Sequence, residues 1–173
     1  MTTKRITYTL PPGSVRAGRP IPDGSVFVVI PSPEYVAAFP AAADAMEALK
    51  KRPGSVPTNA LNVTVCDLAD LPPSGLRFLG AWRYIGGRAV VDLPLARAQR
   101  MAEIRAERDK RLVASDGQIA RAQDIGTPAE VAALKTYRQA LRDVPQAIDL
   151  GTLPTAEALA TFDLVWPMPG RPL

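Results

Sequence analysis

The sequence predicts an α+β fold, with strands in the N-terminal half and helices in the C-terminal half. Up to residue 93, short runs of alternating or β-branched residues recur, as in residues 5–10 and 60–66. From residue 94 onward, apolar residues recur instead at spacings of three and four within charged segments. We therefore expect a small strand–helix–hairpin module over residues 1–93, followed by a helical hairpin with an extended Trp-Pro tail over residues 94–173.

In the N-terminal module, residues 5–10 alternate and predict a strand, and breakers up to Gly24 predict a loop. Residues 25–30 are apolar on both faces and predict a buried strand. A helix should then begin at Ser32-Pro33-Glu34, kink or restart at Pro40, and end at the basic residues 50–52.

Residues 60–66 predict another strand, and residues 76–85 and 88–93 predict a hairpin around a Gly-Gly turn. Trp82 and Tyr84 share one face of that hairpin. We expect both rings to be buried in a core that is short of aromatics, and stacking on nucleic-acid bases is the alternative.

The long helix expected at 94–114 has a thin apolar seam and charges of both signs, with Glu107 and Arg111 spaced for an ion pair. The seam residues are Leu95, Ala98, Met101, Ala102 and Leu112, with Ile104 near its edge. Residues 97–111 carry six basic and three acidic side chains. This mild excess favours a solvated face over a phosphate-binding one.

The second helical arm should begin at Thr127, because threonine can cap a helix, Pro128 fits its first position and Glu130 can complete a capping box. Its apolar stripe comprises Val131, Leu134, Tyr137, Leu141 and Val144, and Pro145 should end the helix. Arg138 and Arg142 lie on another face. They either stay solvated, pair with Asp143 or contact a partner.

After this arm, residues 155–162 predict a short helix, and residues 165–170 an extended apolar end. Trp166 either packs back on the helical hairpin or anchors a partner, since tryptophan is enriched among the residues that dominate interfaces. The two alternatives are evenly matched.

Several of these features together resemble the phage tail assembly chaperone family over about residues 94–169. They are Ser115-Asp116 after a charged helix, a short polar link between the two helical arms, then Tyr137-Arg-Gln-Ala-Leu-Arg-Asp-Val-Pro145, then Trp166-Pro-Met-Pro169. Where family members often carry an aromatic after the Ser-Asp pair, this chain has Gly117, so that ring's contact is either absent or supplied by another side chain. The hairpin and helix at 76–114 also resemble uncharacterised phage tail-region proteins.

The resemblance implies a non-enzymatic protein that binds tail, baseplate or tail-fibre subunits in the host cytoplasm, as an assembly chaperone or as a component kept in the virion. A homo-oligomer would also fit. The partner-binding residues that the motifs indicate are Tyr137, Arg138, Leu141, Arg142, Asp143, Trp166, Pro167 and Pro169. The alternative is a small nucleic-acid-binding phage accessory protein that uses the 97–111 helix.

Composition excludes several kinds of chemistry. The chain of 173 residues has no histidine and a single cysteine, Cys66, so zinc sites built from those ligands and histidine-based triads are excluded. The pairs Asp67/Asp70 and Asp143/Asp149 flank turns, which favours capping roles over acid–base catalysis. We therefore expect no cofactor and no metal. We also expect no membrane span, because the longest apolar run, residues 26–30, is far too short to cross a bilayer. Cys66 should behave as a small buried hydrophobe.

Overall fold

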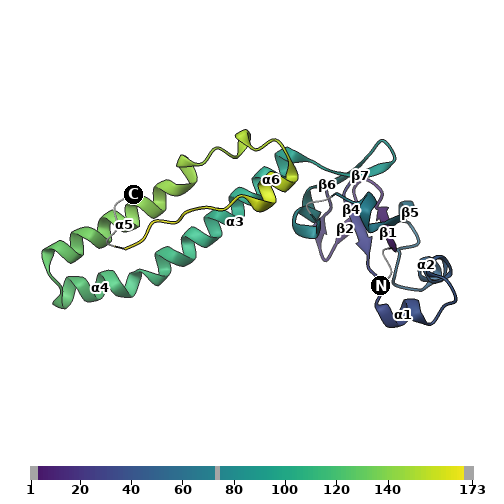
Figure 1. Cartoon of the computed structure of the whole chain (residues 1–173), viewed down its shortest axis with the longest axis horizontal. Helices are drawn as coiled ribbons and strands as arrows, with labels where there is room; N and C mark the ends of the chain where they lie inside the picture. The colour runs from purple at the N-terminus through teal and green to yellow at the C-terminus, as the bar shows by residue number, and fades with distance from the viewer. Residues whose placement is uncertain (1–3, 73–74, 170–173) are drawn as a thin grey trace. The chain divides into compact units, whose positions relative to one another are not determined.

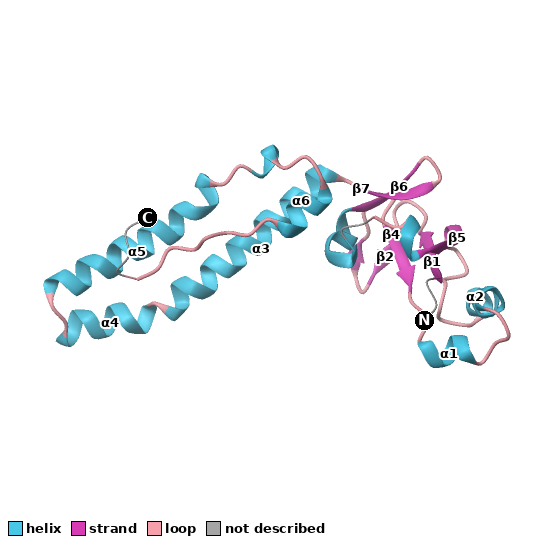
Figure 2. Ribbon diagram, viewed as in Figure 1, coloured by secondary structure: helices cyan, strands magenta, loops and turns pink. Residues whose placement is uncertain are grey.

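The computed structural model describes residues 4–72 and 75–169 of the chain. Strands come first and helices follow, which confirms the α+β class (Figure 2). The chain divides into two compact units, Met1–Ala96 and Arg97–Leu173, which are described separately below.

The N-terminal unit is built on an antiparallel sheet with the strand order β4-β1-β5. Its strands are β1 (Lys4–Thr9), β4 (Val26–Val29) and β5 (Leu61–Asp67), and all three were predicted. Ile6 on the central strand lies opposite Val29 on one side and Val65 on the other. A small hairpin, β2 (Val15–Arg16) with β3 (Arg19–Pro20), lies between β1 and β4 in sequence.

The prediction that residues 25–30 are buried on both faces is wrong for most of the strand. Only Val26 is buried, the rest of β4 is half-buried, and Ile30 is 50% exposed. β4 lies at an edge of the sheet, so its neighbours cover it less completely than they cover β1.

Two short helices cover one face of the sheet (Figure 1). Ser32 caps α1 (Pro33–Ala37), and the chain restarts after Pro40 as α2 (Ala42–Lys51), as the sequence predicts. The core on this face consists of Ile6, Ala45, Met46 and Leu49.

On another side of the sheet lie two 3₁₀ helices, η1 (Leu68–Asp70) and η2 (Gly75–Ala81). They lead into the hairpin of β6 (Trp82–Ile85) and β7 (Arg88–Val91). The Gly-Gly turn is confirmed, and both glycines have positive φ angles. The strand predicted over 76–81 is wrong, because four-residue β7 ends opposite Trp82 and leaves those residues no partner. They coil instead. Phe78 and Trp82 are both fully buried, and Tyr84 packs on the Trp82 cluster as predicted.

The C-terminal unit is helical. Its elements are α3 (Leu93–Ala114), whose first residues belong to the other unit, α4 (Asp116–Ile125), α5 (Pro128–Ala147), η3 (Leu150–Thr152) and α6 (Ala156–Thr161). The helices predicted at 94–114 and 155–162 are confirmed. The link expected between the two arms is itself a helix, α4, which lies along α5 (Figure 1). Its glutamine and alanine residues favour a helix, so the break at Ser115 is shorter than expected.

Pro145 does not end the second arm, because α5 continues to Ala147. Proline in a helix removes one hydrogen bond to the preceding turn. Here that loss falls only two residues before the helix ends, so it breaks no further turn. Pro145 is buried, together with Leu141 and Val144, so its ring contributes to the core.

The seam predicted on α3 is placed incorrectly. Ile104, expected at its edge, is 3% exposed, whereas Leu95 is 38% exposed and Ala98 and Ala102 are also exposed. Arginine side chains on the same helix, at positions 97, 100 and 111, hold the end of the chain against it. The inward face of α3 is therefore set by tertiary contacts that apolar spacing alone does not reveal.

Candidate partner-binding surface of the C-terminal unit

The predicted capping box positions the start of α5. Thr127 Oγ1 accepts a hydrogen bond from the Glu130 backbone N–H at 3.2 Å, and the Thr127 N–H donates to the Glu130 carboxylate at 2.7 Å. The Thr127 N–H, and after it the Thr127 hydroxyl, which donates to the same carboxylate at 3.1 Å, lower the pKa of Glu130 because they stabilise the charged form. The helix therefore begins at a fixed residue.

The apolar stripe of α5 is buried unevenly. Leu141 is fully buried and Val144 is 8% exposed, whereas Val131, Leu134 and Tyr137 are half-buried. The C-terminal half of the helix therefore belongs to the core of the unit, and its N-terminal half keeps apolar surface open.

Arg138 joins the two parts of the motif that are distant in sequence. Its Nη1 atom donates to the carbonyl oxygen of Leu112 at 3.0 Å, to Ser115 Oγ at 2.5 Å and to the Asp116 carboxylate at 2.6 Å. Ser115 is 2% exposed, and its hydroxyl donates to the same Leu112 carbonyl. Arg138 thus fixes the break between α3 and α4 against α5. Of the alternatives considered for Arg138, an ion pair is the one found, but its acidic partner is Asp116 and not Asp143.

The other polar residues of this motif point to solvent. Arg142 and Asp143 are exposed, and Asp143 accepts a hydrogen bond from Gln139 one turn earlier. Gly117 is exposed on α4, and a side chain there would begin with no neighbour within 4 Å. The absent aromatic therefore leaves no gap in the packing.

After α6 the chain returns along α5 as an extended segment, residues 162–169, which we call the return segment (Figure 1). Leu164 and Val165 lie near Ala147 and Ile148, and Pro169 lies near Leu134, so the segment runs antiparallel to the helix. Within the described part of the chain, the backbone from Asp163 to Pro169 makes no hydrogen bond. Side chains therefore hold it in place.

Three arginines of α3 secure the return segment and the turn before it. Arg97 donates to the carbonyl oxygens of Gly151 and Leu153, and Arg100 donates to that of Phe162 at 2.7 Å. The Arg111 guanidinium lies 4.7 Å from the centre of the Trp166 ring, within the range of a cation–π interaction.

Trp166 is accordingly half-buried, and Pro167 is buried, whereas Pro169 is exposed. Of the residues that the sequence indicated for partner binding, four lie largely or fully inside the unit: Arg138, Leu141, Trp166 and Pro167. The accessible ones are Arg142, Asp143, Pro169 and part of Tyr137.

Two apolar residues that the motif reading missed face outward from the return segment. Val165 is 83% exposed and Met168 is 58% exposed. From Phe162 to Trp166, exposed and half-buried residues alternate, so the residues between the inward ones point to solvent. This alternation belongs to the folded segment. In the sequence Leu164, Val165 and Trp166 are all apolar, so local spacing carried no signal that Val165 faces outward.

An open hollow of about 560 Å³ lies beside Val165, between the return segment and α5. Its apolar lining includes Ala140, Val144, Ile148 and Leu164, and Asp143 stands among them. This hollow and the exposed Val165 side chain form a continuous apolar surface with one acidic group.

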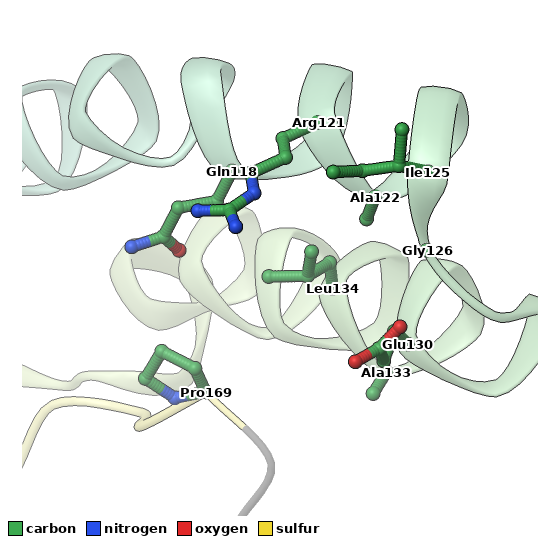
Figure 3. Close-up of a pocket in the computed structure, with 9 residues that line it drawn as sticks. All are labelled: Gln118, Arg121, Ala122, Ile125, Gly126, Glu130, Ala133, Leu134 and Pro169. Carbon is green, nitrogen blue, oxygen red and sulfur yellow. The ribbon is translucent and has the colours of Figure 1, made fainter.

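A second hollow, of about 520 Å³, lies between α4 and α5 and is bordered by Pro169 (Figure 3). Ala122 and Ile125 line it from α4, and Ala133 and Leu134 line it from α5. Its polar lining residues are Gln118, Arg121 and Glu130. Ile125 is 71% exposed, so apolar surface is again open to solvent.

The basic residues of the 97–111 helix are mostly occupied within the chain. Besides the contacts of Arg97 and Arg100, Arg108 pairs with Asp109, and Glu107 pairs with both Lys110 and Arg111. The predicted pair between Glu107 and Arg111 is confirmed at 3.1 Å. These contacts leave few free cations for phosphate.

Three of the four acidic residues in the Asp67/Asp70 and Asp143/Asp149 pairs, all but Asp143, have the capping roles expected of them. Asp67 and Asp70 form the capping box of η1, and the Asp149 carboxylate accepts a hydrogen bond from the Gly151 N–H. Cys66 is half-buried rather than fully buried, and burial raises the pKa of its thiol. Within residues 4–72 and 75–169, no cluster of three or more metal-ligating side chains occurs, and no helix is long and apolar enough to cross a membrane.

Comparison with known proteins supports the reading of the motifs. No curated protein and no solved structure shows significant similarity to the chain. One family model does match, and it covers α4, α5, the return segment and most of α3. The C-terminal part of the chain, residues 101–169, is similar to the phage tail assembly chaperone protein family, as the sequence predicted.

Proposed function

We propose that this chain is a non-enzymatic phage tail assembly chaperone whose C-terminal unit binds an unassembled tail, baseplate or tail-fibre subunit. The family match supports a role in phage tail assembly. The observation that carries the binding surface is the return segment, which turns Val165 and Met168 toward solvent beside an apolar hollow.

The mechanism follows from that surface. An unassembled subunit exposes apolar area that its neighbours cover after assembly, and such area drives association in solution. The two hollows and the outward side chains offer complementary apolar area on a support that is fixed by Arg138 and Arg111. Because this support is already ordered, binding costs little conformational entropy. The chaperone leaves when the subunit's own neighbours bury more area than it does.

Asp143 and Arg142 border the surface and would set its charge preference, since exposed charges at the rim of an interface act mainly on specificity and association rate. Pro169 and Tyr137 complete the accessible part of the predicted site. The N-terminal unit, in this proposal, recognises another tail component. The complex forms in the host cytoplasm.

The test is a pull-down from phage-infected cells with the full chain and with the double variant Val165→Ser/Met168→Ser. Both side chains are largely exposed, so the variant should fold normally. A truncation before Trp166 would be less informative, because it would also remove the ring that packs on Arg111. The control variant is Ile85→Ser, which removes an apolar side chain from the N-terminal unit that is 60% exposed, close to Met168 at 58%.

We expect one tail protein to be captured by the wild type and the control and lost with the double variant, whereas a component that the N-terminal unit binds stays captured by all three chains. Capture that is unchanged by the double variant would contradict this surface. Mass spectrometry of purified particles then separates a chaperone from a virion component: a chaperone is absent from the particles, and a structural piece is present in stoichiometric amounts.

The nucleic-acid alternative gains no support from the geometry, because most cations of the 97–111 helix already have partners within the chain. Binding of DNA or RNA at low salt that weakens steeply as salt is added would favour it instead.

A further inference from the structure

One edge of the N-terminal sheet lies outside the family match, which begins at residue 101. Among residues 4–72 and 75–169, β5 pairs with a strand on one side only, and that strand is β1. Leu61, Asn62, Val63 and Thr64 are all exposed, with Leu61 at 46% and Val63 at 36%. An edge strand of this kind presents unpaired N–H and C=O groups to another strand.

The opposite edge of the same sheet is covered at one end. Ser25, just before β4, pairs with Arg83 of β6, and the Tyr84 N–H donates to the carbonyl oxygen of Gly24 at 3.1 Å. The β6–β7 hairpin thus meets that edge where β4 begins. For β5, no such contact with a strand other than β1 is found among the described residues, so β5 is the more open edge.

β5 also lacks most of the devices that usually protect an edge. From Leu61 to Cys66 it carries no charge and no proline. Asn62 has a positive φ angle, and the pairing with β1 shifts register nearby, so this end of the strand is irregular. From Val63 onward the pairing is regular, which leaves residues 63–66 as the run that a new strand could join.

We propose that β5 pairs antiparallel with β5 of a second copy of this chain. The uncharged run is self-complementary, since two identical strands meeting about a twofold axis would bring no like charges together. Val63, Thr64 and Val65 are residue types that form favourable cross-strand pairs. The product is a six-stranded sheet that joins two N-terminal units.

The experiment measures the dimer dissociation constant of the full chain by analytical ultracentrifugation, for the wild type, Val63→Lys and Val15→Lys. Val15 is 63% exposed on the β2–β3 hairpin, so its variant makes the same chemical change away from β5. Two lysines and two lost valine contacts per dimer should raise the dissociation constant roughly tenfold in Val63→Lys. Val15→Lys should match the wild type.

Hydrogen exchange provides a second measurement that does not depend on a variant. Amides within residues 63–66 should exchange more slowly at concentrations above the dissociation constant than below it, because the new strand pairing protects them. A wild type that stays monomeric, or a dimer that both variants affect equally, would overturn the proposal. So would a dimer with unchanged exchange in β5. None of these three outcomes would bear on the chaperone surface that we propose for the other unit.

Discussion

The two units of this chain differ in how their segments are joined. In the N-terminal unit, apolar clusters around Met46 and Trp82 cover a hydrogen-bonded sheet. The C-terminal unit has an apolar core around Leu141, but there arginines also reach backbone carbonyls and one aromatic ring. Among the described residues, they hold a return segment whose backbone makes no hydrogen bond from Asp163 to Pro169. The contrast shows that charged residues of a helical motif can carry part of the architecture, while the surface that we propose for partner binding is formed by apolar residues beside them.

The largest expected effect compares one core residue from each unit. Trp82→Ala should cost about 3–5 kcal/mol and Leu141→Ala about 2–5 kcal/mol, because each side chain is fully buried. Each variant should lower the stability of the unit that carries it and leave the other unit unchanged. Hydrogen exchange of peptides from both units, measured at increasing urea, shows which unit loses protection.

Trp82→Phe is the control for the first unit. The indole Nε1–H of Trp82 is buried without a hydrogen-bond partner among the described residues, so phenylalanine removes that unpaired group and should cost less than alanine. If either alanine variant lowered protection in both units to the same degree, the two units would be one cooperative structure and the comparison would fail.

A smaller effect tests whether polar contacts organise the C-terminal unit. Arg138→Ala should lower the free energy of unfolding by about 1.5–3 kcal/mol, because it removes charge-assisted bonds to Leu112 and Ser115. The bond to Asp116 contributes little, since that carboxylate is 61% exposed. Arg142→Ala, the matched control on the exposed face, should change it by less than about 0.5 kcal/mol. Equal effects in urea unfolding would show that Arg138 does not fix the α3–α4 break.

The smallest effect concerns the start of α5. Thr127→Ala should cost about 1 kcal/mol through the lost cap. Because the folded-state pKa of Glu130 is lowered, the carboxylate stabilises the folded state fully at pH values above its ordinary pKa of 4.5. This stabilisation is lost as the pH falls through the folded-state pKa. In Thr127→Ala, an NMR titration should find the Glu130 pKa closer to its ordinary value. The Thr127 backbone N–H, the larger cause of the lowered pKa, remains in the variant, so an unchanged pKa would mean only that the Thr127 hydroxyl does not bond the Glu130 carboxylate in solution.

Local signals in the sequence predicted the parts of the structure that depend on a few adjacent residues. The cap at Thr127, the restart after Pro40 and the Gly-Gly turn each follow from backbone chemistry within four residues. The helix α4 was missed because the Ser115-Asp116-Gly117 run indicated a link, whereas the break there is held short by Arg138, far along the chain.

The same limit applies to the candidate site. The motifs indicated the part of the chain that the family model matches, but the exposure of single residues depends on which side of the return segment faces α3, and that follows from Arg100 and Arg111. Neither contact has a signature in local spacing. Trp166 was therefore an ambiguous residue in the sequence, and Val165 beside it was not considered.

The most direct test of the proposed chaperone role is the soluble fraction of the captured tail subunit when it is expressed alone, with the wild-type chain, or with Val165→Ser/Met168→Ser. After ultracentrifugation, we expect the subunit to stay in the supernatant only with the wild type, and to sediment when it is alone or with the double variant. A subunit that remains equally soluble in all three cases would contradict a chaperone that acts through the outward face of the return segment.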